Sequence, residues 1–213
     1  MARIYLYKMT NDDGTAPCVA RGLLTLCLCK PAIRNSARKD DWLVGIAANS
    51  LHADNRLIYV ARITDKKTGG TYFREMPFRD REDCIYEWRK GAFVLRRDAL
   101  HHNDPGHLEH DLGLAPGYRR ANSLLSSEYR YFGAEGSDAY KTHFPAVAKA
   151  IAKLGRGHRV NHNAGLEREL FALAEACLVL PAPLESDGPR RAMRRSACRP
   201  AERFAMLKAK ARC

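Results

Sequence analysis

With 213 residues, of which 46% are hydrophobic and 28% are charged, the chain has the composition of a globular protein with one sizeable core. No apolar run approaches the ~20 residues that cross a bilayer, and residues 1–5 lack the apolar stretch of a signal peptide, so we expect a cytoplasmic protein without membrane partners. Residues 189–213 hold nine basic residues and one acid, and therefore carry +8 of the formal net charge of +12.

The first half of the chain is predicted to consist mainly of strands. Alternating apolar residues indicate a strand at residues 4–9, followed by a turn at residues 11–14. Residues 23–29 form an apolar run typical of a strand inside a sheet, and residues 42–48 form another. Residues 57–64 give the clearest strand, because they are rich in β-branched and aromatic side chains.

The middle of the chain has a less regular pattern. Residues 80–90 fit either a short helix or an exposed connector, and residues 92–96 fit a short strand. Residues 101–117 contain two prolines, three glycines and four histidines, a composition typical of a loop. Strand character returns at residues 123–132.

Two helices are predicted after these strands. Pro145 suits the first position of a helix that ends near Gly155, and Asn163 suits the N-cap of a second helix that ends before Pro181. Because the strands precede the helices, we expect an α+β fold, with a curved or barrel-like mixed sheet flanked by helices.

A domain boundary is expected near residue 181. We predict one domain at residues 1–181 and a basic, flexible C-terminal extension at residues 182–213, where proline, glycine and arginine accumulate. Such a tail binds phosphate chains through counterion release, or it serves as a solubilising end, and the sequence leaves both alternatives open.

The connection after the second predicted strand contains the strongest candidate for a binding site. Lys30 and Arg34 lie four residues apart on a proline-opened helical turn, so they share a face that can hold a phosphate. Asp41 would then bind or activate a polar group of a base, and Trp42 would stack on the base. In the alternative interpretation, Trp42 belongs to the core and the two cations form a solvated face.

A second cationic segment follows the first predicted helix. Arg156, His158 and Arg159 are interspersed with glycines that allow close approach of the backbone, so they are candidates for phosphate contacts. A solvated helix end that interacts with the helix dipole would explain the same charges. Tyr129 and Tyr131 lie two residues apart on one strand, where they would either stack on bases or belong to the core.

The catalytic candidates are Asp41 as a general base and Cys29 as a nucleophile, with a histidine supplied by residues 101–117. The seven cysteines follow no disulfide or zinc spacing, so we expect reduced thiols. An apolar neighbourhood favours the alternative that these cysteines, including Cys29, are small core residues.

The histidine-rich segment offers candidates for metal ligands, namely His101, His107 and His110. Their spacing matches neither H-E-x-x-H nor H-x-x-E-H, and a polar surface loop explains the same residues. We therefore expect neither a bound metal nor another cofactor.

Several short motifs follow one another in an order that resembles a known family. They are Ala16-Pro17-Cys18, Cys29-Lys30-Pro31-x-Ile33-Arg34, Asp41-Trp42-x-x-Gly45, Leu57-Ile58-Tyr59, Tyr129-Arg130-Tyr131-Phe132-Gly133 and Gly155-Arg156-Gly157-His158-Arg159. Over residues 3–165 the chain resembles nucleotide modification associated domain 2, a family of bacterial and phage proteins. The resemblance implies a link to systems that make or handle modified DNA bases. The order of elements is also similar to the PUA and EVE barrels, which bind RNA or modified bases in a pocket.

We predict from these features a protein that binds a nucleotide or a modified base, with DNA or a nucleotide as its partner. The turn with Lys30 and Arg34 would hold phosphate, and the base would lie near Asp41 and Trp42. Two alternatives stay open. The first is a nucleotide-processing hydrolase or transferase that uses Asp41 or Cys29, and the second is an interaction module that its basic tail tethers to DNA.

Overall fold

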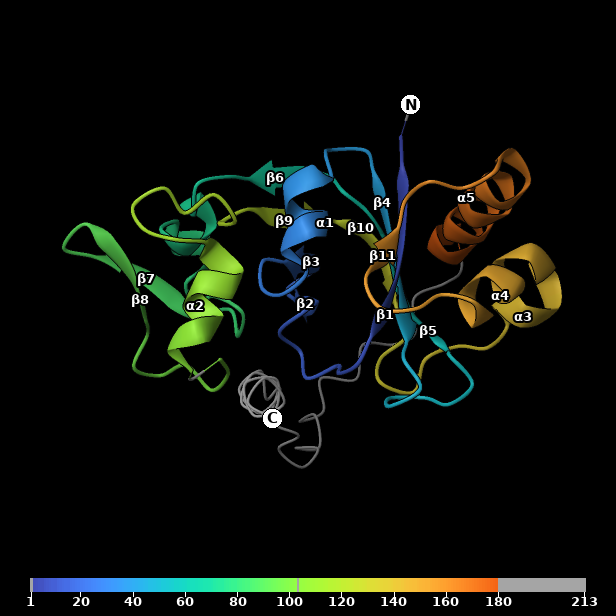
Figure 1. Ribbon diagram of the computed structural model, residues 1–213, viewed down its shortest axis with the longest axis horizontal. Helices are drawn as coiled ribbons and strands as arrows, with labels where there is room; N and C mark the ends of the chain where they lie inside the picture. The colour runs from blue at the N-terminus through green and yellow to red at the C-terminus, as the bar shows by residue number, and fades with distance from the viewer. Residues whose placement is uncertain (1, 103, 180–213) are drawn as a thin grey trace, which may run out of the picture. The chain divides into compact units, whose positions relative to one another are not determined.

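A five-stranded mixed sheet lies at the centre of the fold in the computed structural model, which describes residues 2–102 and 104–179 (Figure 1). In spatial order its strands are β10 (Glu128–Tyr131), β5 (Leu57–Arg62), β4 (Trp42–Ala47), β1 (Ile4–Met9) and β11 (His158–Arg159). β1 and β4 pair in parallel, and the other neighbours pair antiparallel. Both faces of this sheet are buried, because β1, β4 and β5 have almost no exposed residue.

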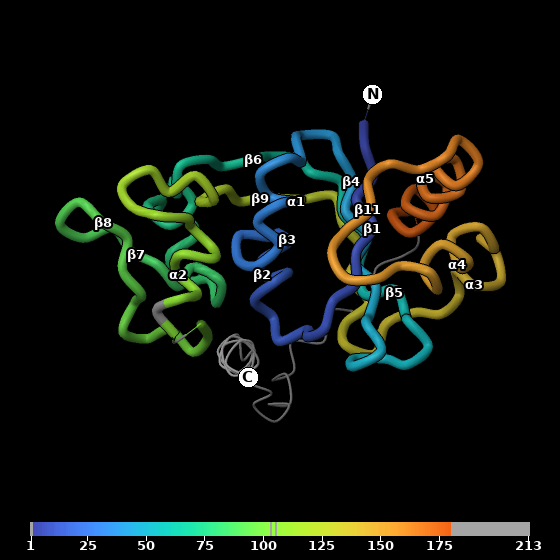
Figure 2. Tube along the Cα trace, viewed as in Figure 1, coloured from blue at the N-terminus to red at the C-terminus, as the bar shows by residue number. Residues whose placement is uncertain are grey.

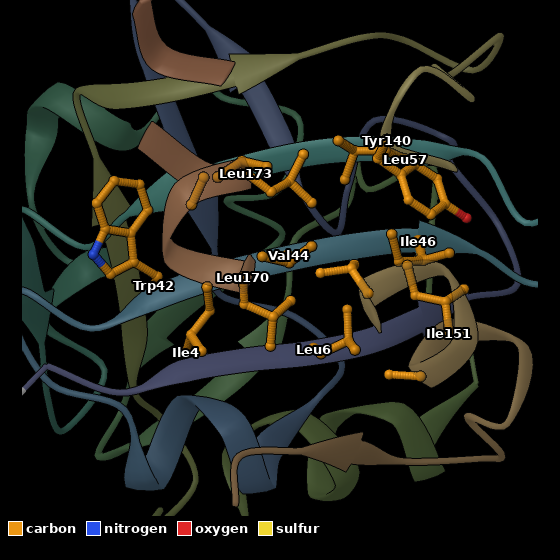
Figure 3. Packing of buried hydrophobic residues seen from close by; sticks show 14 of the residues in the cluster. Ile4, Leu6, Trp42, Val44, Ile46, Leu57, Tyr140, Ile151, Leu170 and Leu173 are labelled. Atoms are coloured by element: carbon orange, nitrogen blue, oxygen red, sulfur yellow. The ribbon is translucent and has the colours of Figure 1, made fainter. Parts of the chain in front are cut away.

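One face of the central sheet is covered by the helices α3 (Tyr140–His143), α4 (Pro145–Ala152) and α5 (Ala164–Val179). Successive side chains of a strand point to opposite faces, so Ile4 and Leu6 of β1 pack against these helices while Tyr5 and Tyr7 point away. Figure 3 shows this apolar layer, in which Leu170 of α5 lies over the strands. Burial of one such leucine contributes about 1.5–3 kcal/mol to stability.

The other face of the central sheet packs against a second sheet and a short helix. In spatial order the strands of this antiparallel sheet are β2 (Cys18–Ala20), β3 (Leu23–Leu26), β9 (Ser123–Ser126) and β6 (Asp65–Lys67). The helix α1 (Pro31–Ser36) follows β3 and contributes Ile33 to the same apolar cluster.

A bend in the chain joins the two sheets. It corrects the prediction of one strand at residues 123–132 and the prediction of a barrel-like sheet. The strand predicted at residues 123–132 is divided at Ser127 into β9 and β10, which belong to different sheets. Ser126 Oγ donates to the Arg62 carbonyl at 2.6 Å, and the Thr64 backbone N–H donates to Leu125 at 2.9 Å, which fixes the bend. The described residues therefore form an α+β fold with mixed sheets and no closed barrel.

A third apolar cluster lies beyond the second sheet and contains the segments that the sequence predicted least well. These segments are η1 (Thr71–Phe73), η2 (Met76–Phe78), the hairpin of β7 (Tyr86–Arg89) and β8 (Ala92–Leu95), and α2 (Pro105–Leu112). Residues 80–90 thus end in a strand, not in a helix or a connector. Residues 101–117 contain a helix, because Asp104 caps α2 by accepting the Gly106 backbone N–H at 2.7 Å.

The two predicted helices near the end of the domain are confirmed. α4 begins at Pro145, although it ends at Ala152, before Gly155. α5 is capped as predicted, since Asn163 Oδ1 accepts the Leu166 backbone N–H at 2.9 Å. Among the described residues no helix is long and apolar enough to cross a membrane. The extension predicted at residues 182–213 lies outside the described residues.

Candidate functional site

The connection from β3 to α1 turns sharply at two residues in the left-handed region. Cys29 has φ 53° and Lys30, the N-cap of α1, has φ 40°. Residues other than glycine adopt this region at a cost, and such strain is often retained at functional sites. Figure 2 follows the chain through this turn, beside which α2 lies.

Arg34 of α1 holds this turn in place from inside the protein. Its side chain is fully buried, and its guanidinium donates to the carbonyl groups of Cys29, Arg120 and Asn122, each at 2.6 Å, and of Asp111 at 2.8 Å. Burial lowers the pKa of this guanidinium, and the charge of Asp111 opposes the shift. Arg34 therefore positions backbone rather than phosphate, because its donors point to carbonyl groups of the protein and no part of it reaches the surface.

Asp111 of α2 is a buried carboxylate with three donors. It accepts the Cys29 backbone N–H at 2.7 Å, the Tyr86 hydroxyl at 2.9 Å and His102 Nδ1 at 2.6 Å. Burial by itself raises the pKa of Asp111, but the hydrogen bond and charge of His102 and the charge of Arg34 outweigh burial and lower it. Asp111 is therefore ionised at neutral pH.

His102 lies between this carboxylate and the thiol of Cys29. Its Nδ1 donates to Asp111, and its Nε2 lies 3.8 Å from Cys29 Sγ. Burial acts to lower the pKa of His102, but the hydrogen bonds with Asp111 and Cys29 outweigh burial and raise it to about 10. The ring is therefore an imidazolium at neutral pH. His102 also has a left-handed backbone, with φ 57°.

Cys29, His102 and Asp111 form a cluster that we call the thiol site. A thiol, an imidazole and a carboxylate in this order are the parts of a nucleophile, its proton-transfer partner and the group that orients the imidazole. The thiolate is the reactive form of a cysteine, and His102 Nε2 lies where it can take and return the proton of this thiol. The arrangement can thus support attack of sulfur on an electrophilic carbon.

Polar side chains from the central sheet surround the same turn. The Lys30 ammonium lies 5.3 Å from the centre of the Tyr7 ring and donates to the Lys8 carbonyl at 3.3 Å. Tyr7 and Tyr59 share a buried hydrogen bond between their hydroxyl groups. Burial and the charge of Lys30 lower the pKa of His158, so these two predicted phosphate contacts lie near one another.

The motifs found in the sequence lie in this turn and in or next to β2, β4, β5, β10 and β11. The chain matches the family described as nucleotide modification associated domain 2 over residues 1–175. The chain belongs to this family. No curated protein and no solved structure matches it. The three residues of the thiol site all lie within the part of the chain that matches nucleotide modification associated domain 2.

In this nucleotide modification associated domain, Asp41 and Trp42 are not part of the thiol site. Asp41 bonds to Arg3 and Arg38, and Trp42 packs in the hydrophobic core. The Asp41 carboxylate accepts the Arg3 backbone N–H at 2.8 Å, the Arg3 guanidinium at 2.7 Å and the Arg38 backbone N–H at 2.9 Å. Trp42, labelled in Figure 3, is only 7% exposed. Its ring packs edge-on against Phe171 of α5. This geometry corrects the expectation that the two side chains face a base.

The other predicted site residues do not come together in one group. Arg156 and Arg159 are exposed, and Arg159 Nε donates to the Asn161 carbonyl at 3.3 Å. His101 Nδ1 lies 3.7 Å from Asp13, whereas His107 stacks on His102. Within residues 2–102 and 104–179, no group of three histidine, cysteine or acidic side chains is arranged to hold a metal ion.

The sequence identified Cys29 and the segment that supplies its histidine, but not which histidine, and it did not identify Asp111. The four histidines of residues 101–117 could not be told apart by their sequence pattern. Only the structure shows that His102 is the one beside the sulfur. Asp111 stood in a segment interpreted as a loop, so its burial could not be foreseen. A helical spacing from the Asp104 cap was the one signal that would have placed it on a helix.

Proposed function

We propose that this domain is a thiol-dependent enzyme, a hydrolase or transferase that acts on a nucleotide or a base in a DNA modification system. The observation that supports this best is the alignment of Cys29 Sγ, His102 and Asp111, at 3.8 Å and 2.6 Å. The family to which the chain belongs supports the nucleotide context. A protein that only binds has no need of an imidazolium held beside a thiol.

The cluster supplies each proton that such a reaction requires. The Cys29 thiolate attacks an electrophilic carbon of the substrate, which forms a sulfur–carbon bond as the bond to the leaving group breaks. The leaving group departs with a proton from His102. Water or another acceptor then gives a proton to His102 and attacks the same carbon, which releases the thiolate and restores the imidazolium. Asp111 stabilises the imidazolium and fixes its orientation.

The residues around the thiol site have supporting roles in this proposal. Lys30 follows Cys29 in the turn and its charge acts on His158, so these two residues are the proposed contacts for a substrate phosphate. Arg34 and Tyr86 are positioning residues, because both hold Asp111 without facing a substrate. Asp41 has no catalytic role here, since its oxygens are occupied by backbone and guanidinium donors.

Alkylation of the full-length protein by iodoacetamide at pH 7, followed by peptide mapping, tests the thiol chemistry. Cys29 should react fastest among the described cysteines, because burial raises the pKa of Cys18 to about 12 and those of Cys84 and Cys177 to about 11. Replacement of His102 by glutamine should slow the reaction of Cys29 by about tenfold or more, because glutamine can neither take nor return the thiol proton.

A matched control and a substrate experiment complete the test. His110→Gln alters an exposed histidine of α2 and should leave the alkylation rate of Cys29 unchanged. Incubation with oligodeoxynucleotides that carry unmodified, hydroxymethylated or carboxylated pyrimidines should give a denaturation-resistant protein–DNA adduct or a changed base, and Cys29→Ser should abolish either. A slow Cys29 that does not depend on His102, or turnover that survives Cys29→Ser, would overturn the proposal.

A further inference from the structure

A cavity of about 430 Å³ lies between the η1–η2 segment and the β7–β8 hairpin, apart from the residues of the thiol site. Its walls combine cations with an exposed aromatic ring. We call it the arginine cavity after four of its lining residues, which together with the aromatic residue are Arg74, Arg79, Arg89, Arg96 and Trp88. None of these residues is among the site residues predicted from the sequence.

The arginine cavity has an excess of positive charge. Two of its cations are paired, since Arg89 lies 2.8 Å from Glu87 and Arg96 lies 2.9 Å from Asp98. Arg74 and Arg79 make no ion pair with any residue that the structure describes, and both are exposed. Two cations held in a concave surface without a carboxylate partner favour an anionic ligand.

Trp88 is held in a fixed orientation at the edge of this cavity. Its ring meets Phe93 and Tyr118 edge-on, at centroid distances of 4.9 Å and 6.0 Å, yet 40% of the residue is exposed. The Arg74 guanidinium lies 4.1 Å from the centre of the ring. Arg96 supports the opposite wall, because it donates to the Arg79 carbonyl at 2.5 Å. The cavity is thus built before any ligand arrives.

We propose that the arginine cavity binds single-stranded DNA, with backbone phosphates at Arg74 and Arg79 and an unpaired base against the exposed part of Trp88 that Arg74 does not cover. Charge complementarity accounts for the phosphates, and an exposed ring backed by other aromatic groups is the platform on which unpaired bases stack. Paired bases in a duplex hide their faces, so Trp88 has no equivalent partner in double-stranded DNA. This inference goes beyond the proposed chemistry and does not depend on it.

Tyr86 connects the two sites within β7. The residue lines the arginine cavity, and its hydroxyl donates to Asp111 of the thiol site. Tyr86 therefore belongs to the wall of the arginine cavity and, through its hydroxyl, to the hydrogen bonds of the thiol site.

Fluorescence anisotropy of the full-length protein with a labelled 15-nucleotide single strand, at a series of salt concentrations, tests the inference. The double variant Arg74→Ala/Arg79→Ala should bind the strand about tenfold more weakly at 0.1 M salt and reduce the salt slope by about 1.4, as expected for two lost phosphate contacts. The control is Lys153→Ala/Arg168→Ala, which removes one exposed cation just after α4 and one in α5. It should weaken binding by less than about twofold.

Trp88 provides the second arm of the test. Trp88→Ala should weaken binding of the single strand by about tenfold and leave binding of the matching duplex nearly unchanged, since only unpaired bases stack on it. Trp88→Phe should keep most of the affinity, which separates stacking from misfolding. Equal losses in the two double variants, or equal losses for strand and duplex in Trp88→Ala, would overturn the inference. An unchanged alkylation rate of Cys29 in these variants shows that the thiol site is intact.

Discussion

Replacing Arg34 with methionine would show how far one buried cation stabilises the thiol site. The guanidinium is fully buried, donates to four backbone carbonyl groups and lies 3.9 Å from the Asp111 carboxylate. Methionine has a comparable length but no donor. The variant therefore leaves four carbonyl groups without their hydrogen bonds and one buried carboxylate without its nearest guanidinium.

The expected loss follows from these contacts. Removal of one partner from a buried ion pair costs about 3–5 kcal/mol. The four lost hydrogen bonds do not add to this in full, because water enters and the neighbouring backbone relaxes. We therefore expect the free energy of unfolding to fall by about 3–5 kcal/mol, which lowers the Tm of a domain of this size by roughly 6–20 °C.

Urea and thermal unfolding, followed by circular dichroism, measure this loss in the full-length chain. Arg38→Met is the matched control, because Arg38 is exposed just after α1 and bonds to Asp41 through its backbone. We expect the control to change the free energy of unfolding by less than about 0.5 kcal/mol. A loss below about 1 kcal/mol for Arg34→Met would refute the reasoning, because the carbonyl groups and Asp111 would then have found other partners.

Two further changes address the pH dependence and the central sheet. Because His102 has a pKa of about 10 in the folded protein and ~6.5 in the unfolded chain, its proton stabilises the fold fully below pH ~6.5 and ceases to do so as the pH rises through 10. The free energy of unfolding, measured in urea from pH 6 to 10, should therefore fall more in the wild type than in His102→Gln. In Gly45→Ala the new Cβ would lie 2.3 Å from the Tyr59 ring, so we expect a loss of about 1–3 kcal/mol in urea unfolding. Gly117→Ala, which meets only ordinary contacts, should change stability by less than about 0.5 kcal/mol.

The parts of the fold that the sequence predicts best are those with strong local patterns. β1 and β5 were foreseen because their apolar and β-branched residues mark strands, and α5 because Asn163 is a good N-cap. The bend at Ser127 was missed, because it depends on hydrogen bonds to Arg62 and Thr64 from another part of the chain. Local sequence does not encode such distant partners.

The binding residues show the same division between local and distant causes. Arg34 has the spacing of an exposed cation on a helical face, but acceptors about 80 residues away in sequence draw it into the interior. Side chains alternate between the two faces of β4, and Trp42 lies on the face that packs against α5. The pairing of Cys29 with His102 likewise depends on Asp111, 82 residues from the cysteine, so sequence spacing could not select it.

Because several residues of the thiol site share the carboxylate of Asp111, the effects of substitutions in this site are expected to be epistatic. Three segments that are distant in the sequence, at Cys29, Tyr86 and His102, all donate to this one side chain. The effect of a substitution at any of them must therefore depend on which residues occupy the other two. Relatives that lack the aspartate would be expected to differ at several of these positions together, so the site would be gained or lost as a unit.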